Sequence, residues 1–126
     1  DIKEKLRRRG ASKEILDKIV ERLLKEKFID ESRYAKAFVR DKYRFDKWGK
    51  LKIRMALKAK SISEENIDTA FGEIDLNEYR SNLSLLIQNK RKSVKAENDY
   101  ELRGKLIRFA LGRGYEMDDI LSILGE

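Results

Sequence analysis

The residues of this chain best suited to chemistry are its lysines and arginines, whose chemistry is the binding of anions. Six of them fall within residues 47–63, KWGKLKIRMALKAKSIS, a stretch that contains no acidic residue. Lys50, Arg54 and Lys58 are four residues apart, so on a helix they would form one cationic stripe. A helix that only faces solvent usually carries both signs of charge. The stretch therefore predicts a surface that meets a negative partner, with a solvated charged face as the alternative.

Two further groups of basic residues accompany this stretch. One forms a stripe on the preceding predicted helix, opposite Phe38 and Val39. The other surrounds the polar segment KAENDY (95–100), which we expect to be an exposed loop. Residues 33–60 carry eleven basic and two acidic residues, whereas residues 61–87 carry one basic and six acidic, so the charge is polarised. The candidate anion-binding residues are Arg33, Lys36, Arg40, Arg44, Lys47, Lys50, Arg54, Lys58, Lys92, Lys95 and Arg103.

The residue types give little support to enzymatic chemistry. The chain has no histidine and no cysteine, which removes the commonest general base, the usual zinc ligands and a thiolate nucleophile. The neighbouring acids Glu64/Glu65 and Asp118/Asp119 would point about 100° apart on a helix, so neither pair converges as an acid and base. The segment GRGYE (112–116) lacks the lysine of a phosphate-binding loop. We therefore expect no catalytic residue, no metal and no cofactor.

Apolar residues recur with helical spacing throughout the chain, which predicts an all-α fold. No stretch alternates like a strand, and no apolar run has the length of a membrane span. We expect the aromatic set to lie in the core, and we expect the other sets to turn their apolar faces inward. The sets that share a helix face are Ile15, Ile19, Leu23 and Leu24; Tyr34, Phe38 and Phe45; Ile53 and Leu57; and Leu102, Leu106 and Ala110.

Three segments align with one another and indicate a helical repeat. They are LRRRGASKEILDKIV (6–20), LKAKSISEENIDTAF (57–71) and ALGRGYEMDDILSIL (110–124). Each joins a basic last helical turn, a turn residue and a second amphipathic helix. The turn residues are Gly10, Ser61 and Gly114, and the residues placed to cap the next helix are Ser12, Ser63 and Glu116.

A further helix precedes the second and third of these pairs, over residues 31–45 and 77–93. We therefore predict tandem three-helix repeats: 1–29 holds the last two helices of an incomplete first repeat, 30–75 forms the second, and 76–126 forms the third. Asp1 falls inside an amphipathic pattern, so we expect the first repeat to lack its beginning. Tyr43 and Trp48 could stack on bases or seal a joint between helices, and for Trp48 we favour the joint.

The ordered motifs of residues 28–71 resemble those of the RecX family of bacterial recombinase regulators. They comprise an acidic turn, Arg-aromatic-Ala, a Lys-x-Gly step and Ile-x-x-x-Leu-x-x-Lys, and the flanking units are similar too. Lys50 stands where the family tends to have proline, and Ser61 where it tends to have glycine. The residues that carry the resemblance are Asp30, Glu31, Arg33, Tyr34, Ala35, Phe38, Val39, Arg40, Lys47, Gly49, Ile53, Leu57, Lys60 and Ile67.

This resemblance implies an elongated, curved array of three-helix units that binds the groove of the RecA–DNA filament. Such a protein inhibits recombinase and ATPase activity in DNA repair and the SOS response, in the cytoplasm and without a cofactor. Single- or double-stranded DNA is a further partner that it allows, and we expect a monomer. The alternatives are a DNA-binding helical repeat module that does not depend on recombinase and a helical scaffold for an acidic partner.

Overall fold

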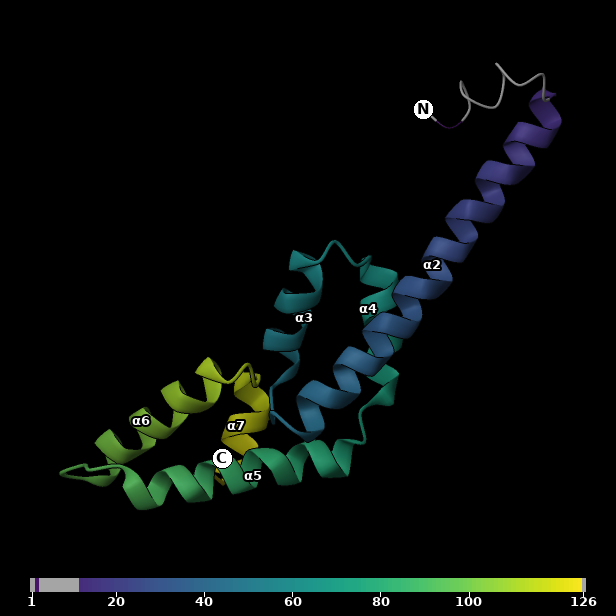
Figure 1. The fold of residues 1–126 in the computed structure, drawn as a ribbon. Helices are drawn as coiled ribbons and strands as arrows, with labels where there is room; N and C mark the ends of the chain where they lie inside the picture. The colour runs from purple at the N-terminus through teal and green to yellow at the C-terminus, as the bar shows by residue number, and fades with distance from the viewer. Residues whose placement is uncertain (1, 3–11, 126) are drawn as a thin grey trace.

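The computed structural model describes residue 2 and residues 12–125, and there all regular structure is helical (Figure 1). This confirms the all-α prediction. No helix of this part combines the length and the apolar character that a bilayer crossing requires. The elements are α2 (Lys13–Arg44), α3 (Lys50–Ala59), α4 (Glu64–Ala70), a 3-10 helix η1 (Phe71–Glu73), α5 (Leu76–Ser93), α6 (Asp99–Gly112) and α7 (Met117–Ile123).

The helices pack as two groups of three. In the first group α3 and α4 lie against the C-terminal half of α2, and in the second α6 and α7 lie against α5 (Figure 1). Buried side chains from both groups form one continuous core, to which α2 contributes Val39, α3 contributes Leu57 and α5 contributes Leu83. The expected inward faces of α3 and α6 are confirmed, since Ile53, Leu57, Leu106 and Ala110 are all buried.

Helix α2 runs unbroken for 32 residues, through the position where two separate helices were expected. The expected break near residue 30 is therefore wrong, and the predicted boundary between the first and second repeats falls inside a helix. The local sequence KFIDESRY contains neither glycine nor proline. Adding one residue to an existing helix is far easier than nucleating a new one, so nothing local ends the helix here.

The N-terminal half of α2 projects away from both three-helix groups (Figure 1). Its apolar residues were expected to face inward, but Ile15, Ile19, Leu23 and Leu24 are exposed, Leu24 by 62%. That expectation is wrong for these four residues in the described structure, although Leu16 in the same half is buried. The predicted turn at Gly10 lies outside the described residues.

The turns after α3 and α6 have the same backbone geometry, as the repeat predicts. Ser61 and Gly114 both have left-handed φ values, 62° and 95°. The amide of Ser61 donates to the carbonyl of Lys58, and the next amide donates to that of Leu57. Gly114 and its neighbour make the same two bonds at the end of α6. This pair of bonds satisfies the carbonyls left free at a helix end, and it places the following helix at a defined angle.

The three expected helix caps are confirmed in part. The hydroxyl of Ser12 accepts a hydrogen bond from the amide of Ile15, and that of Ser63 accepts one from the amide of Asn66. Each bond satisfies an amide that has no partner within its helix. Glu116 is the N-cap residue of α7 but makes no side-chain capping bond, so this part of the expectation is wrong.

A backbone-to-backbone joint connects the two groups. The amide of Gly49 donates to the carbonyl of Arg113 at 2.8 Å, and that of Leu51 donates to the carbonyl of Gly114 at 2.9 Å. A Cβ atom on Gly49 would lie 2.2 Å from the carbonyl carbon of Gly114, so no larger residue fits there. Two buried tyrosines extend the joint. Tyr115 donates from its hydroxyl to the Lys47 carbonyl at 2.8 Å, and the Tyr79 hydroxyl accepts from the Lys50 amide at 2.8 Å.

Candidate partner-binding surface

The predicted stripe on α3 points towards acidic residues of α4. Arg54 donates to Glu64 at 2.6 Å and to Asp68 at 2.8 Å, and Lys58 lies 2.6 Å from the other oxygen of Glu64. The hydrogen bond to Asp68 is the main cause that raises the pKa of the Arg54 guanidinium. The third member, Lys50, has its ammonium group 5.4 Å from the centre of the Tyr79 ring. Arg54 and Lys58 are therefore paired within the chain.

The stripe on α2 is divided in the same way along its length. Its C-terminal members are ion-paired, Arg40 with Glu73 at 3.5 Å and Arg44 with Glu78 at 3.7 Å. Its N-terminal member Arg33 is exposed and has no carboxylate partner among the described residues. Lys36 also has no carboxylate partner among the described residues, and its side chain is half-buried.

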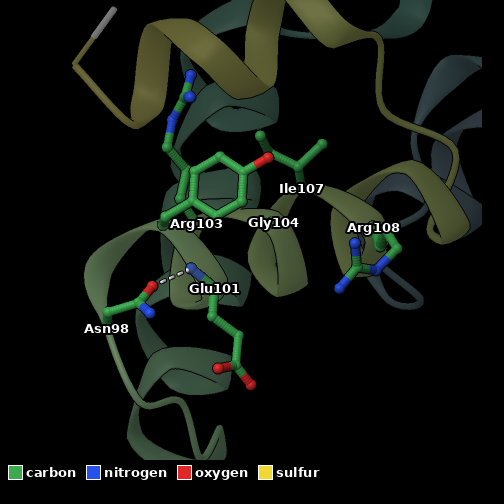
Figure 2. A pocket seen from close by; sticks show the side chains of 7 residues that line it. Asn98, Glu101, Arg103, Gly104, Ile107 and Arg108 are labelled. Carbon is green, nitrogen blue, oxygen red and sulfur yellow. Dashed lines mark hydrogen bonds between the residues drawn. The ribbon is translucent and has the colours of Figure 1, made fainter.

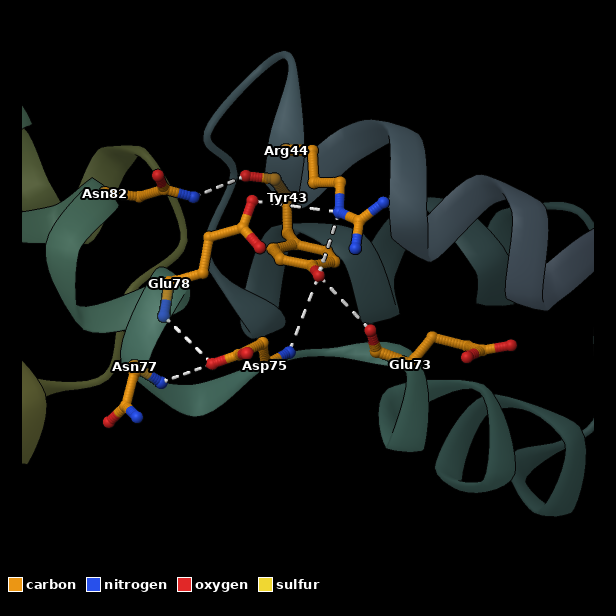
Figure 3. Close-up of polar contacts among 7 residues, drawn as sticks. All are labelled: Tyr43, Arg44, Glu73, Asp75, Asn77, Glu78 and Asn82. Carbon is orange, nitrogen blue, oxygen red and sulfur yellow. Dashed lines mark hydrogen bonds and ion pairs between the residues drawn. The ribbon is translucent and has the colours of Figure 1, made fainter.

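Arg44 belongs to a polar network that ties α2 to the start of α5 (Figure 3). Its Nε donates to the hydroxyl of the buried Tyr43 at 3.1 Å, and this bond is the main cause that raises the pKa of the Arg44 guanidinium. The Tyr43 hydroxyl donates in turn to the Glu73 carbonyl at 3.2 Å, while the side-chain amide of Asn82 donates to the Tyr43 carbonyl at 2.7 Å. Arg44 is held in a structural contact. Tyr43, one of the two aromatics left open by the sequence, is a core residue.

The two stripes consequently do not form one continuous row of free cations. Carboxylates from α4, η1 and α5 neutralise the members that lie next to them. The basic residues have the expected spacing along each helix, but the carboxylates that pair with them come from other helices. Among the described residues, the candidate cations without a carboxylate partner are Arg33, Lys36, Lys47, Lys50, Lys92 and Lys95.

The third predicted region lies where α5 ends and α6 begins. Residues 94–98 form the expected connecting loop, and Lys92 and Lys95 on either side of its start are exposed. Arg103 lines an open hollow of about 500 Å³ on α6, together with Asn98, Gly104 and Arg108 (Figure 2). Asn98 caps the helix there, because its side chain accepts a hydrogen bond from the Glu101 amide (Figure 2).

The carboxylate of Glu101 borders the same hollow and is engaged by a lysine. The ammonium group of Lys105 lies 3.0 Å from it, and this hydrogen bond is the main cause that lowers the pKa of the Glu101 carboxyl. The same ammonium group donates to the Lys95 carbonyl at 2.6 Å, which ties the loop to α6. Part of the positive charge near the predicted third region therefore serves to hold the loop.

The aromatic residues of α2 are less buried than the sequence indicated. Phe38 is half-buried against the core, but Tyr34 is 45% exposed and Phe45 is 78% exposed, so the core prediction is wrong for both. Trp48 lies in the connection between α2 and α3, as favoured, and its ring meets Phe38 edge-on at 6.2 Å. Helical spacing placed Tyr34 and Phe38 on one face of α2 correctly, but that face is an edge of the packed group, and Phe45 follows the end of the helix.

The candidate residues leave out three lysines that gather on these rings, although two of them lie in the basic stretch 47–63. Lys42 and Lys52 have their ammonium groups 4.7 and 4.6 Å from the centre of the Trp48 ring, and Lys60 lies 5.8 Å from that of Phe38. A lysine interleaved with aromatics in KYRFDKWGKLK (42–52) is the available sequence signal. The convergence of lysines from two helices could be seen only in the folded chain.

No group of acidic side chains in the described part of the chain is arranged to hold a metal ion. Fold and surface together define an all-helical protein of tandem three-helix domains with basic patches on its outside. Family models for the second and third three-helix domains of RecX match residues 30–70 and 78–124. The chain belongs to the RecX family of regulatory proteins.

Individual relatives agree with this assignment. The chain is 33% identical over 127 residues to "Regulatory protein RecX" of Clostridium botulinum (strain Alaska E43 / Type E3), an alignment that covers 99% of this chain and 59% of that protein. It is 30% identical to the protein of the same description from Clostridium acetobutylicum, over 100% of this chain and 60% of the other. The chain thus spans somewhat more than half the length of these relatives.

Two solved structures share the fold. One is described as "Crystal structure of regulatory protein RecX", with a TM-score of 0.72 and 22% identity over 98% of this chain and 62% of that one. The other is RecX from Lactobacillus salivarius, with a TM-score of 0.69 and 20% identity over 97% of this chain and 79% of that one. At this identity the likeness concerns the arrangement of helices alone.

Proposed function

We propose that this chain binds a RecA-type recombinase filament on DNA and inhibits its ATP hydrolysis and strand exchange. Membership of the RecX family is the observation that carries the proposal. An elongated chain laid along a filament would contact neighbouring recombinase subunits, and it would hinder the entry of duplex DNA or the motions coupled to ATP turnover. We place this activity in the cytoplasm, where recombination and the SOS response take place.

The cations without a carboxylate partner in the described structure are the ones best suited to the filament contact. Arg33 and Lys36 lie near the middle of α2, before the ion-paired part of the stripe, while Lys47 and Lys50 lie beside the joint. Arg40, Arg44, Arg54 and Lys58 also belong to the proposed surface, but their ion pairs lower the net charge that a partner meets. We therefore expect Arg33 and Lys36 to contribute more to binding than these four.

The test is the DNA-dependent ATPase rate of a bacterial RecA, measured against increasing amounts of this chain. We expect saturable inhibition that weakens as salt is added, because exposed charge pairs are screened. The double variant Arg33→Glu/Lys36→Glu should need at least ten times more protein for half-inhibition. Far-UV circular dichroism should match that of the parent chain, since neither residue has an ion pair in the described structure.

The matched control is Lys18→Glu/Lys25→Glu, which makes the same change of charge on exposed residues of the projecting half of α2. It should inhibit as well as the parent chain does. No inhibition at any concentration of the parent chain would contradict the filament proposal and favour a scaffold for another acidic partner. Equal loss of ATPase inhibition in both variants would mean that inhibition depends on the net charge of the chain and not on the position of the charges on α2.

Direct binding to DNA without recombinase is the second candidate, and the lysines gathered around Trp48 favour it. Titration of a labelled single strand with and without the recombinase separates the two. Filament binding predicts that recombinase raises the apparent affinity for the strand, whereas direct binding predicts an affinity that recombinase leaves unchanged.

A further inference from the structure

The outer face of α6 carries an apolar strip that is open to solvent. Four residues recur there at intervals of four, three and four, which places them along one line of the helix. They are Tyr100, Gly104, Ile107 and Leu111. Tyr100 is 88% exposed and Leu111 is 39% exposed, while Ile107 is half-buried. We call these four residues the α6 strip.

The open hollow of about 500 Å³ lies along the α6 strip (Figure 2). Gly104 lines it without a side chain, between Tyr100 and Ile107. A Cβ atom on Gly104 would meet only the guanidinium group of Arg108, at 3.5 Å, so packing within the chain does not require a glycine here. Glycine inside a helix destabilises the helix relative to alanine. What the glycine provides is room for a side chain of another molecule close to the backbone of α6.

Arginines stand on both edges of the α6 strip. Arg103 and Arg108 lie on opposite sides of Gly104 (Figure 2). Arg108 is exposed, and no carboxylate of the described residues lies within ion-pair distance of it. The carboxylate of Glu101 also borders the hollow, but Lys105 engages it at 3.0 Å. The strip therefore has an apolar centre and cationic edges.

This arrangement corresponds to one side of a two-helix seam. Apolar residues at intervals of four and three occupy the a and d positions of a heptad, and the charges at the flanking e and g positions select the partner helix. In the register of the α6 strip, Arg103 falls at a g position and Arg108 at an e position. A helix laid against the strip brings its own edge residues next to these arginines, so glutamates or aspartates there complement them.

We propose that the α6 strip docks an acidic amphipathic helix of a partner protein, with a large apolar side chain of that helix in the hollow beside Gly104. Recognition of this kind uses apolar anchors at helical spacing. The strip is about 16 Å long, enough for three turns of the bound helix. A nucleic acid fits less well, because Ile107 and Leu111 offer no flat ring on which a base could stack.

Fluorescence anisotropy of a labelled peptide tests this proposal on the whole chain. The probe has three heptads with leucine at a and d and glutamate at e and g, so repulsion between like charges keeps it from pairing with itself. We expect saturable binding that weakens as salt is added. A peptide of the same composition, with its leucines scattered around the helix, should bind at least tenfold more weakly because it has the charge without the apolar face.

Two variants assign the binding to the α6 strip. Arg108→Glu should weaken probe binding at least tenfold, whereas Lys25→Glu, the same change of charge on an exposed residue of α2, should leave it unchanged. Gly104→Gln keeps every charge but fills the hollow with a polar side chain, so it should also weaken binding at least tenfold. Its control is Gly112→Gln, where the added side chain meets open space beside the strip. All four variants should keep the circular dichroism of the parent chain, since these sites are not packed in the core.

Any of three results would overturn the proposal. The first is the absence of saturable probe binding at low salt. The second is equal binding of the probe by the parent chain and by Arg108→Glu or Gly104→Gln. The third is displacement of the probe by the scattered peptide, or by an oligothymidylate of equal charge, as readily as by unlabelled probe, which would reduce the site to a general attraction for anions. Each of these leaves the filament proposal standing, because the ATPase assay rests on Arg33 and Lys36 of α2.

Discussion

Replacing Gly49 with alanine should strongly destabilise the chain, because it forces the two three-helix groups apart. The new Cβ would lie 2.2 Å from the carbonyl carbon of Gly114 and 2.3 Å from the amide nitrogen of Tyr115. The backbones must separate by about 1 Å to relieve this, and such overpacking typically costs ~1–3 kcal/mol. The separation also breaks the bonds from Gly49 to Arg113 and from Leu51 to Gly114, each worth about 1 kcal/mol. We therefore expect the free energy of unfolding to fall by about 3–5 kcal/mol.

Urea unfolding, followed by far-UV circular dichroism and by Trp48 fluorescence, measures this change. The matched control is Gly112→Ala near the same turn, where a Cβ atom would meet no neighbour within 4 Å. Because Gly112 is the last residue of α6, that variant should be neutral or slightly stabilising. A Gly49→Ala chain that unfolds within about 0.5 kcal/mol of the parent would refute the reasoning, because the joint would then have to yield at almost no cost.

Three further outcomes follow from the same structure. Ser61→Gly should raise the free energy of unfolding by up to about 1 kcal/mol, because Ser61 has a left-handed φ of 62° that glycine adopts without strain; a lower melting temperature would contradict this. Burial raises the pKa of the Tyr79 and Tyr115 hydroxyls, so stability should be full below about pH 10 and fall above it, where only the unfolded tyrosines ionise readily. The slope should approach ~1.4 kcal/mol per pH unit for each tyrosine, and a flat profile from equilibrium unfolding would speak against their burial. A double-mutant cycle with Arg54→Gln and Asp68→Asn should give a coupling of about 0.5–1 kcal/mol that shrinks in high salt, since both side chains are partly exposed; a coupling that salt leaves intact would indicate a more deeply buried pair.

The sequence by itself determined the local features of this protein. Helical spacing of apolar residues, serine caps and left-handed turn positions all act within a few residues of one another, so they can be read along the chain. The faces of α3 and α6 with Ile53, Leu57 and Leu106, and the turns at Ser61 and Gly114, were predicted for this reason. The family resemblance rested on the same ordered local motifs, and the family models confirm it.

Only the tertiary structure decided which charges are free and which aromatic rings are exposed. Arg54 has its partners 10 and 14 residues away on α4, and Arg40 has its partner 33 residues away on η1. Helical periodicity places a side chain on a face, but the neighbouring helices decide what that face meets. For the same reason Tyr34 proved to lie at an edge of its group, and lysines from α2 and α3 proved to meet around Trp48.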